Sequence, residues 1–349
     1  MELKLSNEQA ERRQTLIELR ASNYAILGAA LEREVGSFAA SRPELSPRSP
    51  DAPAQFAEWL EGNRLARLWS GIQRQGQEMM WEWAEGVVAS HADRLRQTPA
   101  RGRGSIEPDP LLKMPAYFDG VDFHIQPRGY QDPASGFVYD TMVPLFYMGR
   151  MPVDHYAQVL SAECPVGRPQ RILDLAAGVG HSTLPWAMRF PQAEVHAIDL
   201  SESMLQCLLW NARELALTVH CKQMNAEALR YEAASFDVVT AATLLHELPE
   251  SAIRNVVREA RRVLRPGGAF LVADHVPLGP ETTLFQAFHR WWDTHYNGEP
   301  YVDEFVRLDL ATLLRQEGFA QVEERAIVKP SGHAASAVAR AVVARLTRQ

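Results

Sequence analysis

The chain has 349 residues, of which 46% are hydrophobic and 23% are charged, and its formal net charge is -7. This composition is typical of a globular protein that is long enough for a full α/β domain and a second, smaller unit. An acidic chain without a long basic run is a poor match for nucleic acid as the main partner, because phosphate binding needs clustered Lys and Arg.

The cysteine usage and the start of the chain favour a cytoplasmic protein. The three cysteines are odd in number and show no CxxC spacing, so we expect reduced thiols. The start of the chain is charged, without the apolar core of a signal peptide, and no stretch approaches 18 consecutive apolar residues. We therefore expect a cytoplasmic location and no membrane span.

The first 110 residues are expected to be mainly helical. Ser6 followed by Gln9 fits a capping box at the start of a helix over 6–37. Residues 54–97 form an aromatic and Met-rich helical stretch with four glycines that could break it, Gly62, Gly71, Gly76 and Gly86. Amphipathic helices rich in Trp and Met usually bury their apolar side against another part of a protein. This region is therefore predicted to cap the substrate, to form a homodimer interface or to extend the core.

The pattern changes near residue 171, where short apolar runs begin to alternate with segments of helical spacing. The apolar runs are RILDLAAG, EVHAID, TVHCKQ, FDVVTAA and AFLVAD, with two further strand candidates near 320–329 and 337–345, around the turn Pro330-Ser331-Gly332. The helical segments are 182–190, 202–216, 250–264 and 303–317. This alternation predicts an α/β fold with a Rossmann-like, mostly parallel seven-stranded sheet and flanking helices. The expected organisation is a helical region over 1–110, a linker with lid elements over 111–165 and a catalytic domain over 166–349.

The strongest local signal is a strand that runs into a glycine loop over 173–182, before a helix begins. Gly178 and Gly180 let the backbone approach a ligand closely. The next strand ends in Asp199, and an acid at this place can accept hydrogen bonds from both hydroxyls of an adenosine ribose. The loop therefore predicts a site for an adenosine-containing cofactor.

The carboxylate of Asp174, just before this loop, indicates which cofactor binds. It would repel the pyrophosphate of a dinucleotide and attract a ligand with an α-ammonium group. Thr183 also stands at the third glycine position of the nicotinamide fingerprint. These features favour S-adenosylmethionine over NAD. A nicotinamide-dependent oxidoreductase and a non-catalytic adenosyl-binding scaffold remain the alternatives.

Over about residues 135–329, ordered motifs resemble class I S-adenosylmethionine-dependent methyltransferases, especially the group around ubiquinone and menaquinone methyltransferases. LDLAAGVG resembles the first motif, LDxGxGxG, with Ala176 at the first glycine. AIDLSESML resembles the second motif, and FDVVTAATLLHELPE and RRVLRPGGAFLVAD resemble the fourth and fifth strands. The resemblance implies methylation of a small aromatic or otherwise apolar metabolite, as in natural-product biosynthesis.

The resemblance also implies roles for individual residues of the cofactor site. Asp199 would hold the ribose, Met204 would flank the adenine, and Asn225 would reach the adenine amino group. A tyrosine before the first strand, Tyr139 or Tyr147, would close over the methionine part or only pack there. The full set of expected cofactor contacts is Asp174, Ala176, Gly178, Gly180, His181, Ser182, Asp199, Leu200, Met204, Asn225, Ala226, Ala241, Tyr139 and Tyr147.

His246 is the candidate general base, followed by Glu247. Methyl transfer is an in-line displacement, and a base is needed only when the nucleophile still carries its proton. The pair resembles the His-Asp pair of small-molecule O-methyltransferases, in which the acid holds the imidazole. O-methylation is therefore slightly favoured over C- or N-methylation, and a structural or cofactor-side role for His246 is the alternative.

Four further side chains are candidates for the substrate site. His275 follows the fifth strand, at the edge where ligands bind in open α/β sheets, although a hydrogen-bonded loop histidine is the other interpretation. His124 lies in the linker, next to turns that could carry it into the pocket. Trp292 and Tyr296, four residues apart on a predicted helix, could stack on a flat substrate or simply pack.

No metal site is expected from the sequence. In the segment after the fifth strand, His289 and His295 are six residues apart. Helical metal sites usually place histidines at i and i+4, or supply carboxylates in register. The pattern therefore predicts a site without a metal ion, with a small molecule as the methyl acceptor.

Overall fold

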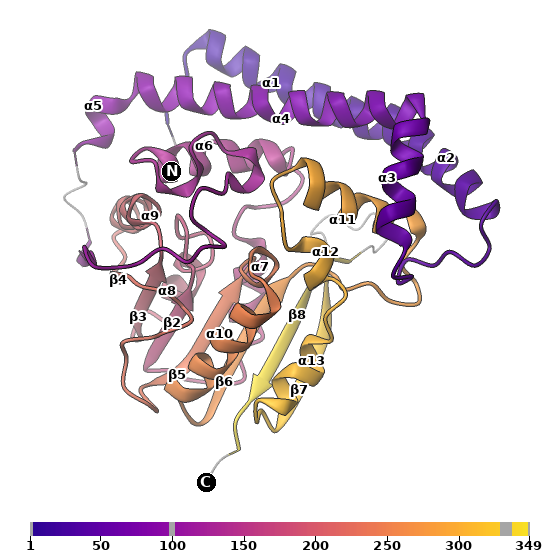
Figure 1. Ribbon diagram of the computed structural model, residues 1–349. Helices are drawn as coiled ribbons and strands as arrows, with labels where there is room; N and C mark the ends of the chain where they lie inside the picture. Colours follow the sequence, from indigo (N-terminus) through magenta and orange to yellow (C-terminus); the bar gives the residue numbers. More distant parts are fainter. Residues whose placement is uncertain (1–2, 98–101, 329–336, 348–349) are drawn as a thin grey trace.

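A layer of N-terminal helices lies over one end of an α/β domain in the computed structural model of the chain (Figure 1). The structure describes residues 3–97, 102–328 and 337–347. Figure 1 shows α1 and α4 running side by side above the domain, with α6 between α4 and the sheet. Within the described residues, no helix combines the length and the apolar character that crossing a bilayer requires.

The described strands form one sheet with the order β1-β4-β3-β2-β5-β6-β8-β7. Neighbouring strands are parallel from β1 to β6, and β8 pairs antiparallel with both β6 and β7. The strands are β1 (Gly104–Glu107), β2 (Arg171–Leu175), β3 (Glu194–Asp199), β4 (Val219–Gln223), β5 (Phe236–Ala242), β6 (Leu264–Asp274), β7 (Gln321–Val328) and β8 (Ala337–Arg345). The predicted α/β fold with a mostly parallel sheet is confirmed. The turn predicted at 330–332 lies outside the described residues.

The sheet has one strand more than the seven that the sequence predicts. The extra strand, β1, lies in the first 110 residues, which were expected to be helical, and pairs with β4 at the sheet edge. A Cβ at Gly104 would lie 2.6 Å from the carbonyl oxygen of Val219, so glycine is what allows this close approach. A four-residue strand without an apolar run gives no periodic signal, because its existence depends on a partner about 115 residues away.

Helices cover both faces of the sheet, and each face has its own hydrophobic core. The central strands β2, β3 and β5 are almost fully buried, as expected for a parallel sheet covered on both sides, whereas most residues of the edge strand β7 are exposed. The helix predicted over 303–317 is two helices, because the chain turns at 306–309. The helices are α6 (Ser135–Phe146), α7 (His155–Ala162), α8 (Leu184–Arg189), α9 (Glu202–Glu214), α10 (Glu250–Val263), α11 (Leu284–Tyr296), α12 (Val302–Phe305) and α13 (Leu310–Gln316).

The N-terminal layer begins at the predicted capping box, since Ser6 and Gln9 bond reciprocally. Of the four glycines that could break the second helical stretch, only Gly62 does so, and α4 continues through the other three. The elements of this layer are α1 (Asn7–Ser22), the π-helical turn η1 (Asn23–Gly28), α2 (Ala29–Ala40), α3 (Ala52–Gly62), α4 (Arg64–Ser90) and α5 (Ala92–Leu95).

The N-terminal layer packs against the α/β domain through aromatic side chains. Trp69 of α4 meets Trp292 of α11 edge to face, with ring centroids 5.0 Å apart. Near the other end of α4, Trp81 and Trp83 belong to a buried cluster shared with α6. The layer is therefore a packed part of the fold and forms a roof over the end of the sheet.

Two glycine substitutions test this packing. Gly71→Ala should stabilise the protein by about 0.5–1 kcal/mol, because alanine favours the helical conformation more than glycine does. The added Cβ would have no atom of the described residues within 4 Å, so it would cause no clash. Gly136→Ala should destabilise it by about 1–3 kcal/mol, because a Cβ there would lie 3.0 Å from the Cα of Met204 in α9. Urea denaturation followed by circular dichroism measures both changes, and equal effects would contradict the close contact between α6 and α9.

Candidate active site

The glycine loop joins β2 to α8 through a run of left-handed backbone. Ala176, Gly178 and Gly180 have φ angles of 50°, 51° and 97°. A Cβ at Gly180 would lie 3.0 Å from Leu208, so this position needs glycine for packing as well as for conformation. Ala176 has the same left-handed backbone conformation although it carries a side chain, so the backbone is strained there. It stands at the position where the family resemblance leads us to expect the first glycine.

Asp199 ends β3 beside this loop. Its Oδ2 accepts a hydrogen bond from the backbone N–H of Gly178 at 2.9 Å, and its Oδ1 accepts one from that of Ser201 at 2.8 Å. Burial raises the pKa of Asp199 to about 6, although these backbone donors act in the opposite direction. A carboxylate has about four lone-pair sites, more than its backbone donors occupy, so the group can still accept a hydrogen bond from a ligand.

Asp174 lies beneath the loop, fully buried. Its Oδ2 accepts hydrogen bonds from the hydroxyls of Ser182 and Thr183, each at 2.6 Å. Its Oδ1 is buried and has no hydrogen-bond partner in the part of the chain that the structure describes. Burial raises the pKa of Asp174 to about 7, even though the two hydroxyls lower it. A buried carboxylate oxygen without a donor is the kind of group that a cationic ligand satisfies.

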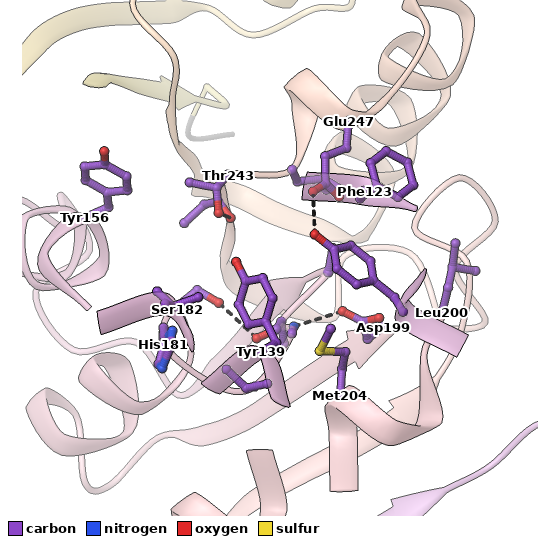
Figure 2. Close-up of a pocket in the computed structure, with 18 of the residues that line it drawn as sticks. Phe123, Tyr139, Tyr156, His181, Ser182, Asp199, Leu200, Met204, Thr243 and Glu247 are labelled. Carbon is purple, nitrogen blue, oxygen red and sulfur yellow. Dashed lines mark hydrogen bonds between the residues drawn. The ribbon is translucent and has the colours of Figure 1, made fainter. Parts of the chain in front are cut away.

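A first cavity opens between this loop and a wall of aromatic side chains. Figure 2 shows Asp199, Leu200 and Met204 on one side of it and His181 and Ser182 on another, with Tyr139 standing between. The aromatic wall consists of Tyr117, Phe118, Phe123, Tyr130, Tyr139, Tyr147 and Tyr156. Of the expected cofactor contacts, nine line this cavity: Ala176, Gly178, His181, Ser182, Asp199, Leu200, Met204, Tyr139 and Tyr147.

The other expected cofactor contacts lie beside or below the cavity and do not line it: Asp174, Gly180, Asn225, Ala226 and Ala241. Ala241 is fully buried in β5, opposite Leu175 of β2. The Asn225 side chain turns back on its own loop and accepts a hydrogen bond from the N–H of Glu227 at 2.8 Å. The structure therefore brings together the glycine loop and the end of β3, and gives Asn225 a local partner.

A second cavity of about 550 Å³ adjoins the first. Tyr24 of η1, His289 of α11 and His275 after β6 line it, so its walls come from the N-terminal layer as well as from the α/β domain. Its volume is in the range that small-molecule sites occupy. Six residues line both cavities: Tyr139, Val143, Tyr147, Tyr156, Thr243 and Glu247.

Of the four predicted substrate contacts, two line the second cavity and two do not. His124 and His275 line it. Trp292 instead packs on Trp69 and donates its indole N–H to Ser70 at 2.7 Å, and Tyr296 stacks on Trp292. Of the two interpretations of Trp292 and Tyr296, packing agrees with these contacts and stacking on a substrate does not, because this side of α11 faces α4. The cavity side of the same helix is formed by Phe285, His289 and Asp293.

His246 sits on a short 3-10 turn after β5, η4 (Leu245–Glu247), where it is 3% exposed. Its Nδ1 lies 2.7 Å from Oδ1 of Asp274, at the end of β6. The backbone N–H groups of Leu245 and His275 also donate to Asp274, which fixes the carboxylate. The expectation that Glu247 holds the imidazole is therefore wrong, because the adjacent strand end supplies the acid.

Glu247 and Glu299 face two histidines across the junction of the cavities. Glu247 accepts a hydrogen bond from the Tyr130 hydroxyl at 3.1 Å and lies 3.5 Å from Nε2 of His124. Glu299 contacts Nδ1 of His124 and lies 3.7 Å from Nε2 of His246. No sequence signal points to Glu299, because Asn297-Gly298-Glu299 has only the pattern of a turn.

The backbone around His124 is held from two directions. The side chains of Gln77 and Trp81, both in α4, donate to the His124 carbonyl oxygen at 2.7 and 2.9 Å. On the other side, the His124 N–H donates to the Gly298 carbonyl oxygen at 3.3 Å. His124 itself has a left-handed φ of 54°. The N-terminal layer thus fixes one of the polar side chains at the junction.

The junction is strongly polarised by its buried carboxylates. Burial alone would lower the pKa of His124, but the carboxylates of Glu299 and Glu247 raise it to about 10. Burial likewise opposes the charge on His246, while Asp274, Glu299 and Glu247 raise its pKa to about 9. His275 has no such partner among the described residues, and burial lowers its pKa well below the usual value.

Comparison with known proteins identifies relatives of the α/β domain. Residues 172–268 match the family described as methyltransferase domain. The chain is similar to an uncharacterised methyltransferase, YcgJ, from Bacillus subtilis, at 32% identity over 37% of this chain and 49% of that protein. It is also similar to the ubiquinone/menaquinone biosynthesis C-methyltransferase UbiE from Dinoroseobacter shibae, at 30% identity over 45% of this chain and 68% of that protein. The chain thus spans about half of the first relative and about two thirds of the second.

A solved structure with a similar shape is an O-methyltransferase family protein from Burkholderia thailandensis. The two chains share 17% sequence identity, the TM-score is 0.48, and the match covers 78% of this chain and 72% of that chain.

A glycine substitution tests how Glu299 is positioned. Gly298 has a φ of 68°, and a Cβ there would collide with the Asp122 carbonyl oxygen and lie 2.9 Å from the N of Ile125. Gly298→Ala should therefore cost about 2–4 kcal/mol of folding free energy, from conformational strain and overpacking together. Urea denaturation followed by tryptophan fluorescence measures this loss.

The matched control for that variant is Gly120→Ala. Gly120 has a similar φ of 71°, but its Cβ would meet no atom of the described residues within 4 Å. The control should cost only about 1 kcal/mol, from the conformation alone. If both variants lost the same stability, the close approach of residues 122–125 to Gly298 would be contradicted.

Proposed function

Since the chain belongs to the class I S-adenosylmethionine-dependent methyltransferases, we propose that it transfers the methyl group of this cofactor to a small acceptor held in the second cavity. The observation that carries this proposal is the junction of the two cavities, where Tyr139, Tyr147, Thr243 and Glu247 line both. A cofactor in the first cavity and an acceptor in the second would meet there. The mixed aromatic and polar lining of the second cavity suits a small aromatic or otherwise apolar molecule with a polar group.

The residues of the first cavity fit the cofactor. Asp199 would accept hydrogen bonds from the ribose hydroxyls, and Leu200 and Met204 would pack on the adenine. Asp174 lies just under the loop, and its unpaired Oδ1 would stabilise the α-ammonium group. Asn225 stays a proposed adenine contact, which would require it to leave its bond to Glu227. When bound, the cofactor supplies an electrophilic methyl group on a sulfonium sulfur.

The contribution of the protein is mainly alignment and the exclusion of water. Tyr139, Tyr147 and Tyr156 stand where the two cavities meet and would hold both ligands in line. Positioning of this kind can supply about 7–11 kcal/mol of barrier lowering. The N-terminal helices take part as a cap, because Tyr24 lines the second cavity and α4 holds His124. A homodimer through the same helices stays a prediction.

We infer that oxygen is the atom that receives the methyl group. The support is His246, whose Nε2 faces the second cavity while Asp274 orients the ring through Nδ1. Only the neutral imidazole can accept a hydroxyl proton as the nucleophile attacks, and with a pKa raised to about 9 His246 supplies this form at alkaline pH. A neutral amine acceptor needs no base, so it would leave this buried pair without a function in the transfer.

Ligand binding by Asp199 should depend on pH. The probe is 5′-methylthioadenosine, which has the ribose but no ammonium group, so that it reports on Asp199 and not on Asp174. Its affinity should be highest above pH 7 and fall by up to about tenfold for each pH unit below about 6, as Asp199 takes up a proton. Isothermal titration calorimetry measures this dependence.

The variant Asp199→Asn provides the comparison. It should bind the same probe weakly at pH 8 and show little change in affinity between pH 8 and pH 5. Wild-type affinity for this variant at pH 8 would mean that Asp199 does not hold the sugar.

The proposed part of His246 in the transfer is tested with the His246→Ala variant. Turnover should fall by roughly 10²–10⁴, with the affinity for S-adenosylhomocysteine unchanged. The assay is transfer of a labelled methyl group to acceptors in a mixture of small phenols and other metabolites. Activity equal to that of the parent enzyme would show that His246 has a structural role.

A further inference from the structure

Four side chains from three distant segments meet at the junction of the cavities, and we name them the junction cluster: His124, His246, Glu247 and Glu299. Each offers one nitrogen or oxygen atom, and these atoms all lie within 4.8 Å of one another. We propose that the junction cluster binds one divalent transition-metal ion, which holds an oxygen atom of the acceptor beside the transferred methyl group. The inference rests on the proposed function and specifies how its acceptor is held.

The donor set indicates the class of ion. Two imidazole nitrogens and two carboxylates suit first-row ions such as Mn²⁺, Fe²⁺, Co²⁺ or Zn²⁺. Mg²⁺ and Ca²⁺ prefer sites made of oxygen ligands alone. Four protein ligands would leave positions open on an ion that takes five or six, and an acceptor oxygen could fill one of them.

An unpaired atom supports the site independently of the spacing of the cluster. Glu299 is 4% exposed, and its Oε2 has no hydrogen-bond partner in the described part of the chain. This oxygen lies 3.7 Å from Nε2 of His246, too far for a hydrogen bond. A buried carboxylate oxygen without a donor is costly, and an ion between it and the imidazole would remove that cost.

The surroundings of the junction cluster are those of a metal site. Ligating histidines usually give their second ring nitrogen to a carboxylate, and Nδ1 of His246 does so with Asp274 at 2.7 Å. Glu247 accepts a hydrogen bond from Tyr130 at 3.1 Å, which orients the carboxylate.

The position of the junction cluster fits the proposed transfer. All four of its side chains line the second cavity, and Glu247 lines the first as well. A hydroxyl bound to the ion would lose its proton to water more readily, because the positive charge stabilises the oxyanion. In the metal-loaded protein, Nε2 of His246 would bind the ion and could not accept a proton. His246 could therefore act as a base only in the metal-free protein.

The expectation of a site without metal came from His289 and His295 on one helix. Neither belongs to the junction cluster: His295 bonds back to Trp291 of its own helix, and His289 stacks on Tyr24. The six-residue spacing of these two histidines therefore concerns a site on that helix alone, whereas the ligands of the junction cluster come from other segments.

Mn²⁺ binding to the full chain tests the inference. The protein is stripped with EDTA, dialysed and titrated with Mn²⁺, and the free ion is followed by its electron paramagnetic resonance signal. We expect one ion per chain. Glu299→Gln should weaken binding by about tenfold or more, and Asp274→Asn, which acts through His246, by about 10–100-fold. The matched control is Glu281→Gln, at an exposed glutamate, which should bind Mn²⁺ as the parent does.

Two outcomes would overturn the inference: binding of far less than one ion per chain, or equal affinity in the Glu299→Gln and Glu281→Gln variants. S-adenosylhomocysteine affinity, measured on the same samples, shows that the variants are folded. If the stripped protein binds this compound and transfers methyl groups at the full rate, the metal inference fails and the proposed function stands. If no preparation binds the compound, the proposed function itself fails.

Discussion

Moving a carboxylate out of water costs free energy that only hydrogen bonds, an ion pair or a cation can offset, and this protein gathers several such groups at one edge of its sheet. Asp199 is satisfied by backbone N–H groups, and Asp174 is satisfied in part by two hydroxyls. Asp274 has an imidazole as well as backbone donors. Glu299 keeps an oxygen without a partner among the described residues. Where the protein leaves a carboxylate incompletely satisfied, a ligand can complete the site.

The N-terminal helices contribute to the site because hydrogen bonds from α4 fix the backbone at His124. The backbone is left-handed at His124 and at the next residue, Ile125, and this conformation is unfavourable for the β-branched Ile125. Gln77 and Trp81 of α4 fix this backbone through the carbonyl oxygen of His124. Through these two hydrogen bonds the N-terminal layer helps to position a polar side chain that lines the second cavity.

Helix α11 shows how one element contributes to both packing and the cavity. Trp292 and Tyr296 lie on the side that faces α4, where aromatic contacts fasten the N-terminal layer to the domain. His289 and Asp293 lie on the side that faces the second cavity. Aromatic residues suited to stacking on a ligand are thus used in the interface, and the cavity side is more polar than expected.

The sequence by itself determined the features that are local in the chain. The strand that carries Asp174, the glycine loop and the acid at the end of the next strand follow one another within 30 residues, so alternation of apolar runs and turn residues was enough to predict them. The parallel sheet followed from the same alternation, and the ordered motifs indicated the family.

Only the tertiary structure decided which side chains meet from distant segments. Asp274, rather than the adjacent Glu247, holds His246 because two strand ends lie side by side in the sheet. Glu299 reaches His124 across 175 positions of the chain because Gly298 lets two loops touch. The extra strand β1 and the cavity side of α11 likewise depend on partners elsewhere in the fold. Periodicity reports which residues share a face of one element, but it carries no information about what packs against that face.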